Sequence, residues 1–384
     1  MQHKFSYLLS LFFVANQNGG FFDKEKCFSF FFGVLCSLIM IVSLSSTNMG
    51  VSTETSPEQS QAFPMQELTL TGDIFTIHVE NETFWDGIGC YTVETGSSHT
   101  NASKSILYSG ADGDAWSTYL TIHVIETKTD YVTTTDSPSP SISGYSVVNM
   151  DPYVSSGPSI VGNAIITIWT LPEGLVVNQT LVSEGSAMKD GRFRATTIVT
   201  NNNATESFTV GIRYEWDYAI DDVDGSVMRT INPNSTYFTA EKNWTNPTFH
   251  YYEESDNSTP TLTVLSSVNE PTAIEPRATP PSRLVFTDWG YGYDYSYNYT
   301  THNETVTGDS CMLYLWDDNG LAENGGSVNV TAYIATPEFV VTHPPEEPEV
   351  SEFLSSSLGF IALSVSLLVI AVTLYKRNHL RRTN

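Results

Sequence analysis

The sequence predicts an all-β protein built around a large antiparallel β-sandwich. Short runs of alternating apolar and polar residues recur between turn-rich breaks, which is typical of half-buried strands. The chain also contains 20 Tyr, 20 Phe and 7 Trp among its 384 residues, and aromatic side chains suit a pleated surface. Between the two ends of the chain, no segment has the spacing of an amphipathic helix. These observations argue against a globular α/β enzyme.

The charge of the chain excludes two classes of protein. Its formal net charge is −26, yet only 16% of its residues are charged and 40% are hydrophobic. A disordered acidic tail would contain fewer apolar residues, and a nucleic-acid binder would present a basic surface. An acidic surface attracts cations and repels anionic headgroups. We therefore expect no nucleic-acid partner.

The C-terminal end predicts a membrane anchor. The stretch from Phe353 to Tyr375 carries no charge and would form a helix of roughly 34 Å, enough to cross a hydrocarbon core. Lys376, Arg377, Arg381 and Arg382 follow it, and the positive-inside rule places these bases in the cytoplasm. We expect an integral protein of the cell membrane with its ectodomain outside the cell.

The N-terminal end carries a second apolar segment, from Cys27 to Ser46, behind a flank that includes Lys24 and Lys26. This pattern is typical of a signal peptide, with Ser43 and Ser45 near a plausible cleavage point. Its length of about twenty residues also suits a signal anchor that remains uncut. The protein is single-pass if the segment is cleaved, and the sequence leaves both alternatives open.

Composition divides the chain into seven parts. Pro-rich stretches mark a linker and a stalk, because Pro makes a segment extended and unsuited to a central strand. The predicted parts are a signal peptide or signal anchor (1–50), an N-terminal β region (51–134), a linker (135–144), the main β-sandwich (145–336), a Pro/Glu stalk (337–352), the transmembrane helix (353–375) and a basic cytoplasmic tail (376–384).

Ten N-x-[ST] triplets without Pro at the middle position lie between the two apolar ends. Such triplets accept N-linked glycans in secreted proteins, so their distribution indicates a glycosylated exterior. The asparagines that begin them are Asn81, Asn101, Asn178, Asn203, Asn234, Asn243, Asn257, Asn298, Asn303 and Asn329.

Cysteine usage predicts one disulfide. Of the four cysteines, only Cys90 and Cys311 lie outside the N-terminal apolar segment. Oxidation is permitted outside the cell, so we expect a bridge between the early and the late part of the ectodomain. The alternative is two unpaired buried thiols. Two cysteines are too few for a structural zinc site.

The clearest local unit is RFRATTIVTNNNATESFTVGIRYEW, from Arg192 to Trp216. Two alternating runs flank an Asn-rich turn that contains the triplet at Asn203. This arrangement predicts a β-hairpin on the surface.

One acidic loop suggests cation binding. Asp217, Asp221, Asp222 and Asp224 crowd together before Gly225, and carboxylate-rich loops of this kind bind Ca²⁺. The loop lacks the spacing of an EF-hand. The competing interpretation is that Asp-Gly pairs build a tight turn between strands. Calcium is the only cofactor that the sequence suggests.

The segment DWGYGYDYSYNYTT places an aromatic residue at every second position. On a strand these side chains would share one face. That face would be either a platform for sugar rings or a surface packed against the neighbouring sheet, and we favour packing. The six residues are Trp289, Tyr291, Tyr293, Tyr295, Tyr297 and Tyr299.

One stretch resembles a known kind of surface module. It runs from Gly191 to Thr336 and contains YEWDYAIDDVDGS, RATPPSRLVFTDWG and CMLYLWDDNGLAENGGSVNVTAYIA. It resembles a large β-sandwich module of archaeal and bacterial surface proteins, similar in outline to galactose-mutarotase-like supersandwiches. The end of the chain resembles archaeal surface proteins that are anchored by a C-terminal helix and a basic tail. Some of these carry a Pro-Glu-Phe sorting signal, whereas here Pro337, Glu338 and Phe339 stand well before the helix.

No motif of a known enzyme class accompanies this resemblance. The sequence contains no G-x-S-x-G, H-E-x-x-H or G-x-x-x-x-G-K-[ST], and no catalytic residue is predicted. We expect a non-enzymatic cell-surface protein with a structural, adhesion or recognition role, whose partners are glycans or other surface proteins. The alternative is a surface carbohydrate-binding protein or carbohydrate-active enzyme, in which two carboxyl groups would meet at a sugar.

Overall fold

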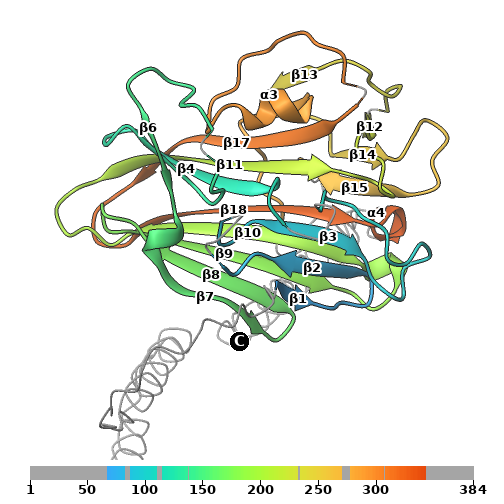
Figure 1. Cartoon of the computed structure of the whole chain (residues 1–384), viewed down its shortest axis with the longest axis horizontal. Helices are drawn as coiled ribbons and strands as arrows, with labels where there is room; N and C mark the ends of the chain where they lie inside the picture. The colour runs from blue at the N-terminus through green and yellow to red at the C-terminus, as the bar shows by residue number, and fades with distance from the viewer. Residues whose placement is uncertain are drawn as a thin grey trace, which may run out of the picture. The chain divides into compact units, whose positions relative to one another are not determined.

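The computed structural model of this protein describes residues 67–342, apart from 83–86, 110–114, 137, 232–233, 270–276 and 307. The predicted signal segment, transmembrane helix and basic tail lie outside the described residues. Within them the protein is all-β with antiparallel sheets, as the sequence predicts (Figure 1). No helix in this part of the chain is long and apolar enough to cross a membrane.

Two large sheets and one small sheet contain the strands. The eight-stranded sheet has the order β12 (Val227–Ile231), β14 (Tyr251–Ser255), β15 (Thr263–Ser267), β18 (Gly326–Ala335), β10 (Arg192–Asn201), β9 (Leu175–Glu184), β8 (Ala164–Thr170) and β7 (Val154–Val161). The seven-stranded sheet has the order β13 (Lys242–Thr245), β16 (Arg283–Thr287), β17 (Ser310–Leu321), β11 (Phe208–Tyr218), β4 (Tyr119–Val124), β5 (Thr129–Val132) and β6 (Ser146–Asn149). The small sheet consists of β1 (Leu68–Leu70), β2 (Phe75–Val79) and β3 (Tyr91–Thr95). Among these described strands, only β5 and β6 pair in parallel. The short helices are η1 (Asp151–Tyr153), η2 (Met188–Asp190), α3 (Trp289–Tyr293) and α4 (Pro337–Thr342).

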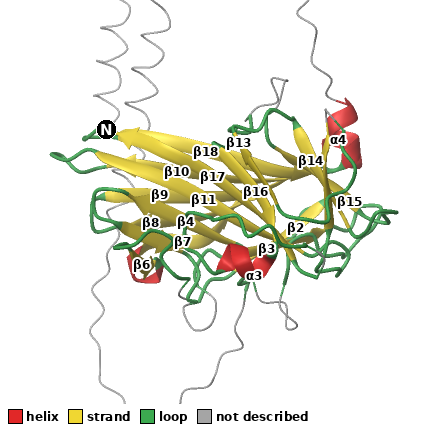
Figure 2. Ribbon diagram, turned by 90° about the horizontal axis from the view of Figure 1, so that it is seen from above, coloured by secondary structure: helices red, strands yellow, loops and turns green. Residues whose placement is uncertain are grey.

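The two large sheets pack face to face, and the alternation of side chains along each strand explains the core between them. Along β11, Tyr214, Trp216 and Tyr218 point inward and are fully buried. The Tyr214 hydroxyl donates a hydrogen bond of 2.8 Å across the core to Thr197 of β10. One cluster of buried apolar side chains takes residues from both sheets, and Figure 2 shows the strands of the two sheets overlying one another.

The predicted hairpin from Arg192 to Trp216 is wrong. β10 pairs with β9 and β18 in one sheet, whereas β11 pairs with β4 and β17 in the other. The chain therefore crosses between the sheets after β10. β17 and β18 make the same crossing beside it, where the backbone N–H of Asn324 donates to the carbonyl of Asn203 (2.9 Å). A hairpin and a crossing both need two alternating strands and a short turn, so the sequence pattern does not distinguish them.

The predicted linker at residues 135–144 does not separate two sheets. β4 and β5, which come from the predicted N-terminal β region, lie between β11 and β6 in the seven-stranded sheet. From the small sheet, the Tyr91 hydroxyl accepts a hydrogen bond of 2.6 Å from the Trp216 indole in the core. In the linker itself, the backbone N–H of Ser139 donates to the carbonyl of Asp294 (2.8 Å). The N-terminal β region and the main sandwich therefore share one core.

The first part of the predicted stalk folds onto the sandwich. Pro337–Thr342 forms α4, and Phe339 is buried against Tyr251, Tyr333 and Ala335. Tyr333 and Ala335 belong to β18, so α4 covers part of the outer face of the eight-stranded sheet. The remainder of the stalk lies outside the described residues.

The predicted disulfide between Cys90 and Cys311 is not formed, because Cys311 carries a free, buried thiol. Cys90 packs against Tyr119 of β4 and Val132 of β5, whereas Cys311 lies on β17. β11 stands between β4 and β17, and two strand spacings amount to roughly 10 Å. This separation exceeds the distance that a disulfide spans. Burial also raises the pKa of the Cys311 thiol well above its usual value.

Candidate functional site

The tyrosine-rich segment, DWGYGYDYSYNYTT at residues 288–301, packs on the outer face of the seven-stranded sheet. The predicted strand is wrong here, because Trp289–Tyr293 forms the short helix α3, which lies over β17 (Figure 1). Asp288 caps this helix, since its carboxylate accepts the backbone N–H of Gly290 at 3.1 Å. A helical turn rotates successive side chains by about 100°, so residues at every second position no longer share one face.

Two glycines allow the segment to lie close to the sheet. A Cβ on Gly292 would lie 2.5 Å from the sulfur of Cys311. A Cβ on Gly211 of β11 would lie 2.1 Å from the hydroxyl oxygen of Tyr297. Side chains larger than hydrogen would push the segment away from the sheet at both positions.

The six aromatic residues of the segment do not form one exposed platform. Tyr297 and Tyr299 are buried beside Leu313 and Leu315 of β17. The other four, Trp289, Tyr291, Tyr293 and Tyr295, are half-buried. The segment is packed, as the favoured interpretation expected, but against the outer face of one sheet and not between the two sheets.

A buried arginine ties this cover to the sheet. Arg213 of β11 is fully buried. Its guanidinium donates to the backbone carbonyls of Gly292 (2.6 Å), Tyr295 and Tyr297 (3.3 Å). It also forms an ion pair with the fully buried Glu215. A buried charge persists only where it is paired and hydrogen-bonded, and both conditions hold for Arg213.

β11 carries three buried charged residues on its outer face: Arg213, Glu215 and Asp217. Arg213 is the partner of Glu215. Asp217 is 3% exposed, and no ion pair in the described part of the chain includes it. The outer face therefore ends in a buried carboxyl group that lacks a basic partner.

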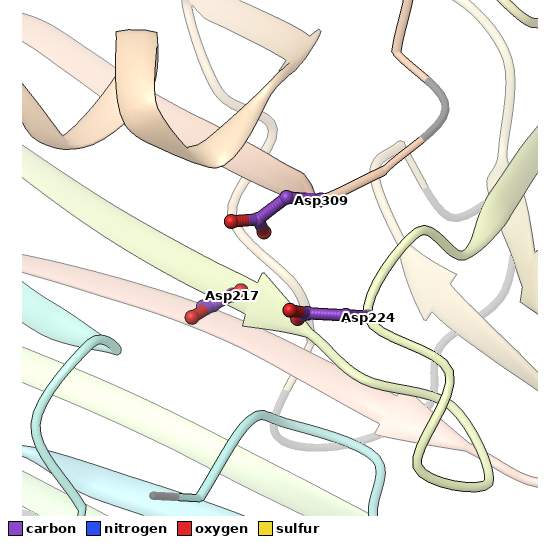
Figure 3. Close-up of side chains that lie close together, drawn as sticks. All are labelled: Asp217, Asp224 and Asp309. Carbon is purple, nitrogen blue, oxygen red and sulfur yellow. The ribbon is translucent and has the colours of Figure 1, made fainter.

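Three carboxyl groups meet at the end of β11. Asp224 follows in the loop to β12, and Asp309 directly precedes β17. Because β11 and β17 are antiparallel, with Asp217 opposite Cys311, the end of one strand meets the start of the other. One carboxylate oxygen from each of Asp217, Asp224 and Asp309 lies within 4.8 Å of the other two. Figure 3 shows the three side chains turned toward a common space.

Burial and mutual repulsion make negative charge costly at this carboxylate cluster. Burial, together with the neighbouring Asp224 and Asp288, raises the pKa of Asp309 to about 7. Burial also raises the pKa of Asp217 well above its usual value, with additional contributions from Asp309 and Asp224. The pKa of Asp224 is raised by burial as well. A positive charge placed among them would relieve this cost.

Several buried oxygens at the cluster have no hydrogen-bond partner among the described residues. They are Oδ1 of Asp217, Oδ1 of Asp309 and Oγ of Ser117. Ser117 is fully buried, and its hydroxyl lies near enough to the Asp217 carboxyl to oppose the rise in its pKa. Buried polar atoms are nearly always paired, so three unpaired oxygens in one place need an explanation.

The other two members of the predicted calcium loop do not join the cluster. Asp221 forms an ion pair with Lys104 (2.5 Å), and the Asp222 carboxylate accepts a hydrogen bond from Ser105 (3.0 Å). Both aspartates have left-handed backbone angles, with φ of 55° and 61°, which is typical of Asp in tight turns. Asp221 and Asp222 therefore belong to a tight turn between strands, as the competing interpretation proposed.

The third member of the cluster, Asp309, is not predicted by the sequence. It stands in a short T-G-D-S stretch before β17, and only the pairing of β17 with β11 brings it to Asp217. A prediction that β17 pairs with β11 would therefore have identified Asp309 as a member of the cluster.

Aromatic side chains border the cluster. Burial raises the pKa of Tyr108, and all three carboxylates of the cluster raise it further, which places its hydroxyl near them. The Tyr108 ring contacts Trp116 edge to face, with ring centroids 6.1 Å apart, and Trp116 contacts Trp289 at 5.3 Å. These three rings are half-buried.

A separate open pocket of about 500 Å³ includes Pro280, Pro281 and Trp316 in its lining. Among its described lining residues, the only carboxylate is Asp317, which accepts hydrogen bonds from Ser282 (2.9 Å) and from the Tyr297 hydroxyl. A glycosidase needs a pair of carboxyl groups facing the sugar, and the described lining does not supply a pair.

Among known proteins, no family model matches this chain and no curated protein matches it.

Replacing Arg213 tests the anchoring of the tyrosine-rich segment. Arg213→Met should lower the free energy of unfolding by about 3–5 kcal/mol, because it leaves Glu215 as an unpaired buried charge. Lys104→Met is the control. Lys104 pairs with Asp221 and its side chain is 40% exposed, so its loss should change the free energy of unfolding far less. Denaturant unfolding followed by tryptophan fluorescence measures both, and equal losses would contradict the anchoring role.

Proposed function

We propose that this protein is a glycosylated cell-surface protein, held in the cell membrane by its C-terminal apolar segment. Its role is structural, or lies in adhesion or recognition, and it acts without catalysis. Its ectodomain stands outside the cell and meets glycans or other surface proteins.

The observation that carries this proposal is the placement of the glycan acceptor asparagines. All ten lie in the described part of the chain, and none of them is buried. Five are exposed: Asn234, Asn243, Asn257, Asn303 and Asn329. The other five are half-buried. An oligosaccharide can be attached only where the amide reaches solvent, and the five exposed asparagines meet this condition.

The two ends of the chain support the membrane placement. The segment from Phe353 to Tyr375 is uncharged and is followed directly by Lys376 and Arg377, which favours a transmembrane helix with a cytoplasmic tail. The apolar segment from Cys27 to Ser46 would direct the chain out of the cell, either as a cleaved signal peptide or as an anchor. The resemblance to archaeal surface proteins fits the same arrangement.

One observation favours sugar recognition as the second candidate function. The half-buried rings of Trp116, Trp289 and Tyr293 lie together, with the centroids of Trp289 and Tyr293 at 5.3 and 6.0 Å from that of Trp116. Aromatic rings of this kind stack on sugars. Hydrolysis of a sugar is less well supported, because Asp217 is 3% exposed and a sugar ring would not reach its carboxyl group.

The membrane orientation is tested with intact cells that express the chain with a tag after Asn384. Protease added outside should degrade residues 51–350, because the ectodomain is exposed, while the tag stays protected in the cytoplasm. Immunoblotting of the tag and of the ectodomain measures both. Digestion of the tag from outside would reverse the proposed orientation.

Glycosylation is tested at two neighbouring asparagines. Asn243→Gln should lower the mass of the protein by one glycan, because Asn243 begins an N-W-T triplet and is exposed. Asn246→Gln is the matched control, since Asn246 is equally exposed but begins N-P-T, in which Pro blocks the acceptor. Mass spectrometry of protein from glycosylating cells distinguishes them. An ectodomain without any attached glycan would contradict the proposal.

A further inference from the structure

We infer that Asp217, Asp224 and Asp309 hold a calcium ion, with the Ser117 hydroxyl as a further ligand and solvent completing the coordination. This site goes beyond the proposed surface role and does not depend on it.

The geometry of the cluster suits calcium. Ca²⁺ binds oxygen ligands at about 2.4 Å, so two ligands on opposite sides of the ion are about 4.8 Å apart. One carboxylate oxygen from each of the three aspartates lies within 4.8 Å of the other two, so an ion placed between them can approach all three. The donor set consists of oxygens alone, which favours Ca²⁺ over zinc and other ions that prefer nitrogen and sulfur.

The charges around the cluster leave a place for a cation. Arg213, which is buried on this face, is already paired with Glu215. No described ion pair includes any of the three aspartates. A divalent ion offsets two of the three negative charges and reduces their repulsion.

The unpaired oxygens are an independent sign of a ligand. Oδ1 of Asp217, Oδ1 of Asp309 and Oγ of Ser117 are buried without a hydrogen-bond partner in the described part of the chain. Ser117 is no member of the acidic cluster and is fully buried, and its hydroxyl interacts with the Asp217 carboxyl only from outside ordinary hydrogen-bond geometry. Coordination to one ion satisfies all three oxygens at once.

The burial of the site admits an ion and excludes a larger ligand. Asp217 lies at the inner end and is 3% exposed, whereas Asp224 and Asp309 are half-buried and reach the surface. An ion can therefore enter past these two residues. Once bound, it joins the end of β11, the loop to β12 and the start of β17, where the Ser310 N–H already donates to the carbonyl of Asp224 (3.1 Å).

The test uses the full chain purified in detergent at about 0.15 M KCl, which screens weak binding to the acidic surface. Calcium in hundredfold excess over its Kd should raise the melting temperature by about 5–10 °C relative to chelator, because it binds only the folded state. Asp309→Asn and Asp224→Asn should each abolish most of this shift. Both residues are half-buried, so the variants are expected to fold.

Asp222→Asn is the matched control. It removes the same charge from the same loop, but Asp222 is exposed and lies outside the cluster, so its calcium shift should equal that of the wild type. Terbium gives a second readout, because the three aspartates act on the pKa of Tyr108 and the Trp116 ring contacts that of Tyr108, and nearby aromatic rings sensitise terbium emission. The emission should appear with the wild type and Asp222→Asn and fall at least tenfold with Asp309→Asn. Identical melting curves with calcium and with chelator, or equal calcium shifts in all variants, would overturn the inference.

Discussion

The buried guanidinium of Arg213 is the interaction on which the outer face of the seven-stranded sheet depends. It lies in the middle of β11 and binds the backbone of the tyrosine-rich segment at three carbonyls. Arg213 also pairs with Glu215. Without this pair, the charged outer face of β11 would need contact with water, and the tyrosine-rich segment could not cover it. With this cover in place, both faces of β11 are buried. Its aromatic side chains point into the core between the sheets, and its charged side chains point toward the tyrosine-rich segment.

The same arrangement explains why Asp217 is unusual. It continues the charged side of β11 but lies beyond the reach of Arg213, where the chain leaves the sheet. The antiparallel partner strand brings Asp309 to this point, and the following loop brings Asp224. Three carboxyl groups in a partly buried place are unfavourable unless protons or a cation accompany them. A calcium ion would make the end of the sheet depend on the calcium concentration around the protein.

The sequence predicts the fold class well, because alternation along strands such as β10 and β11 requires only local information. It fails where the answer depends on which strands pair. The hairpin between these strands is wrong because both sheets accept the same pattern, and Asp309 is missed because it reaches Asp217 only through β17. The tyrosine-rich segment also alternates, but the cap at Asp288 and the contact of Gly292 with the sheet favour a helix. The disulfide fails because spacing along the chain contains no information about β11 lying between the two cysteines.

The central claim is that the buried charges of this face are completed by a cation, and a crystal structure grown with calcium tests it most directly. The account predicts an anomalous peak within about 2.6 Å of oxygens from Asp217, Asp224 and Asp309. Crystals grown with chelator should lack this peak. A structure grown with calcium that shows no peak, with the three carboxyl groups joined by short hydrogen bonds through shared protons, would contradict the account.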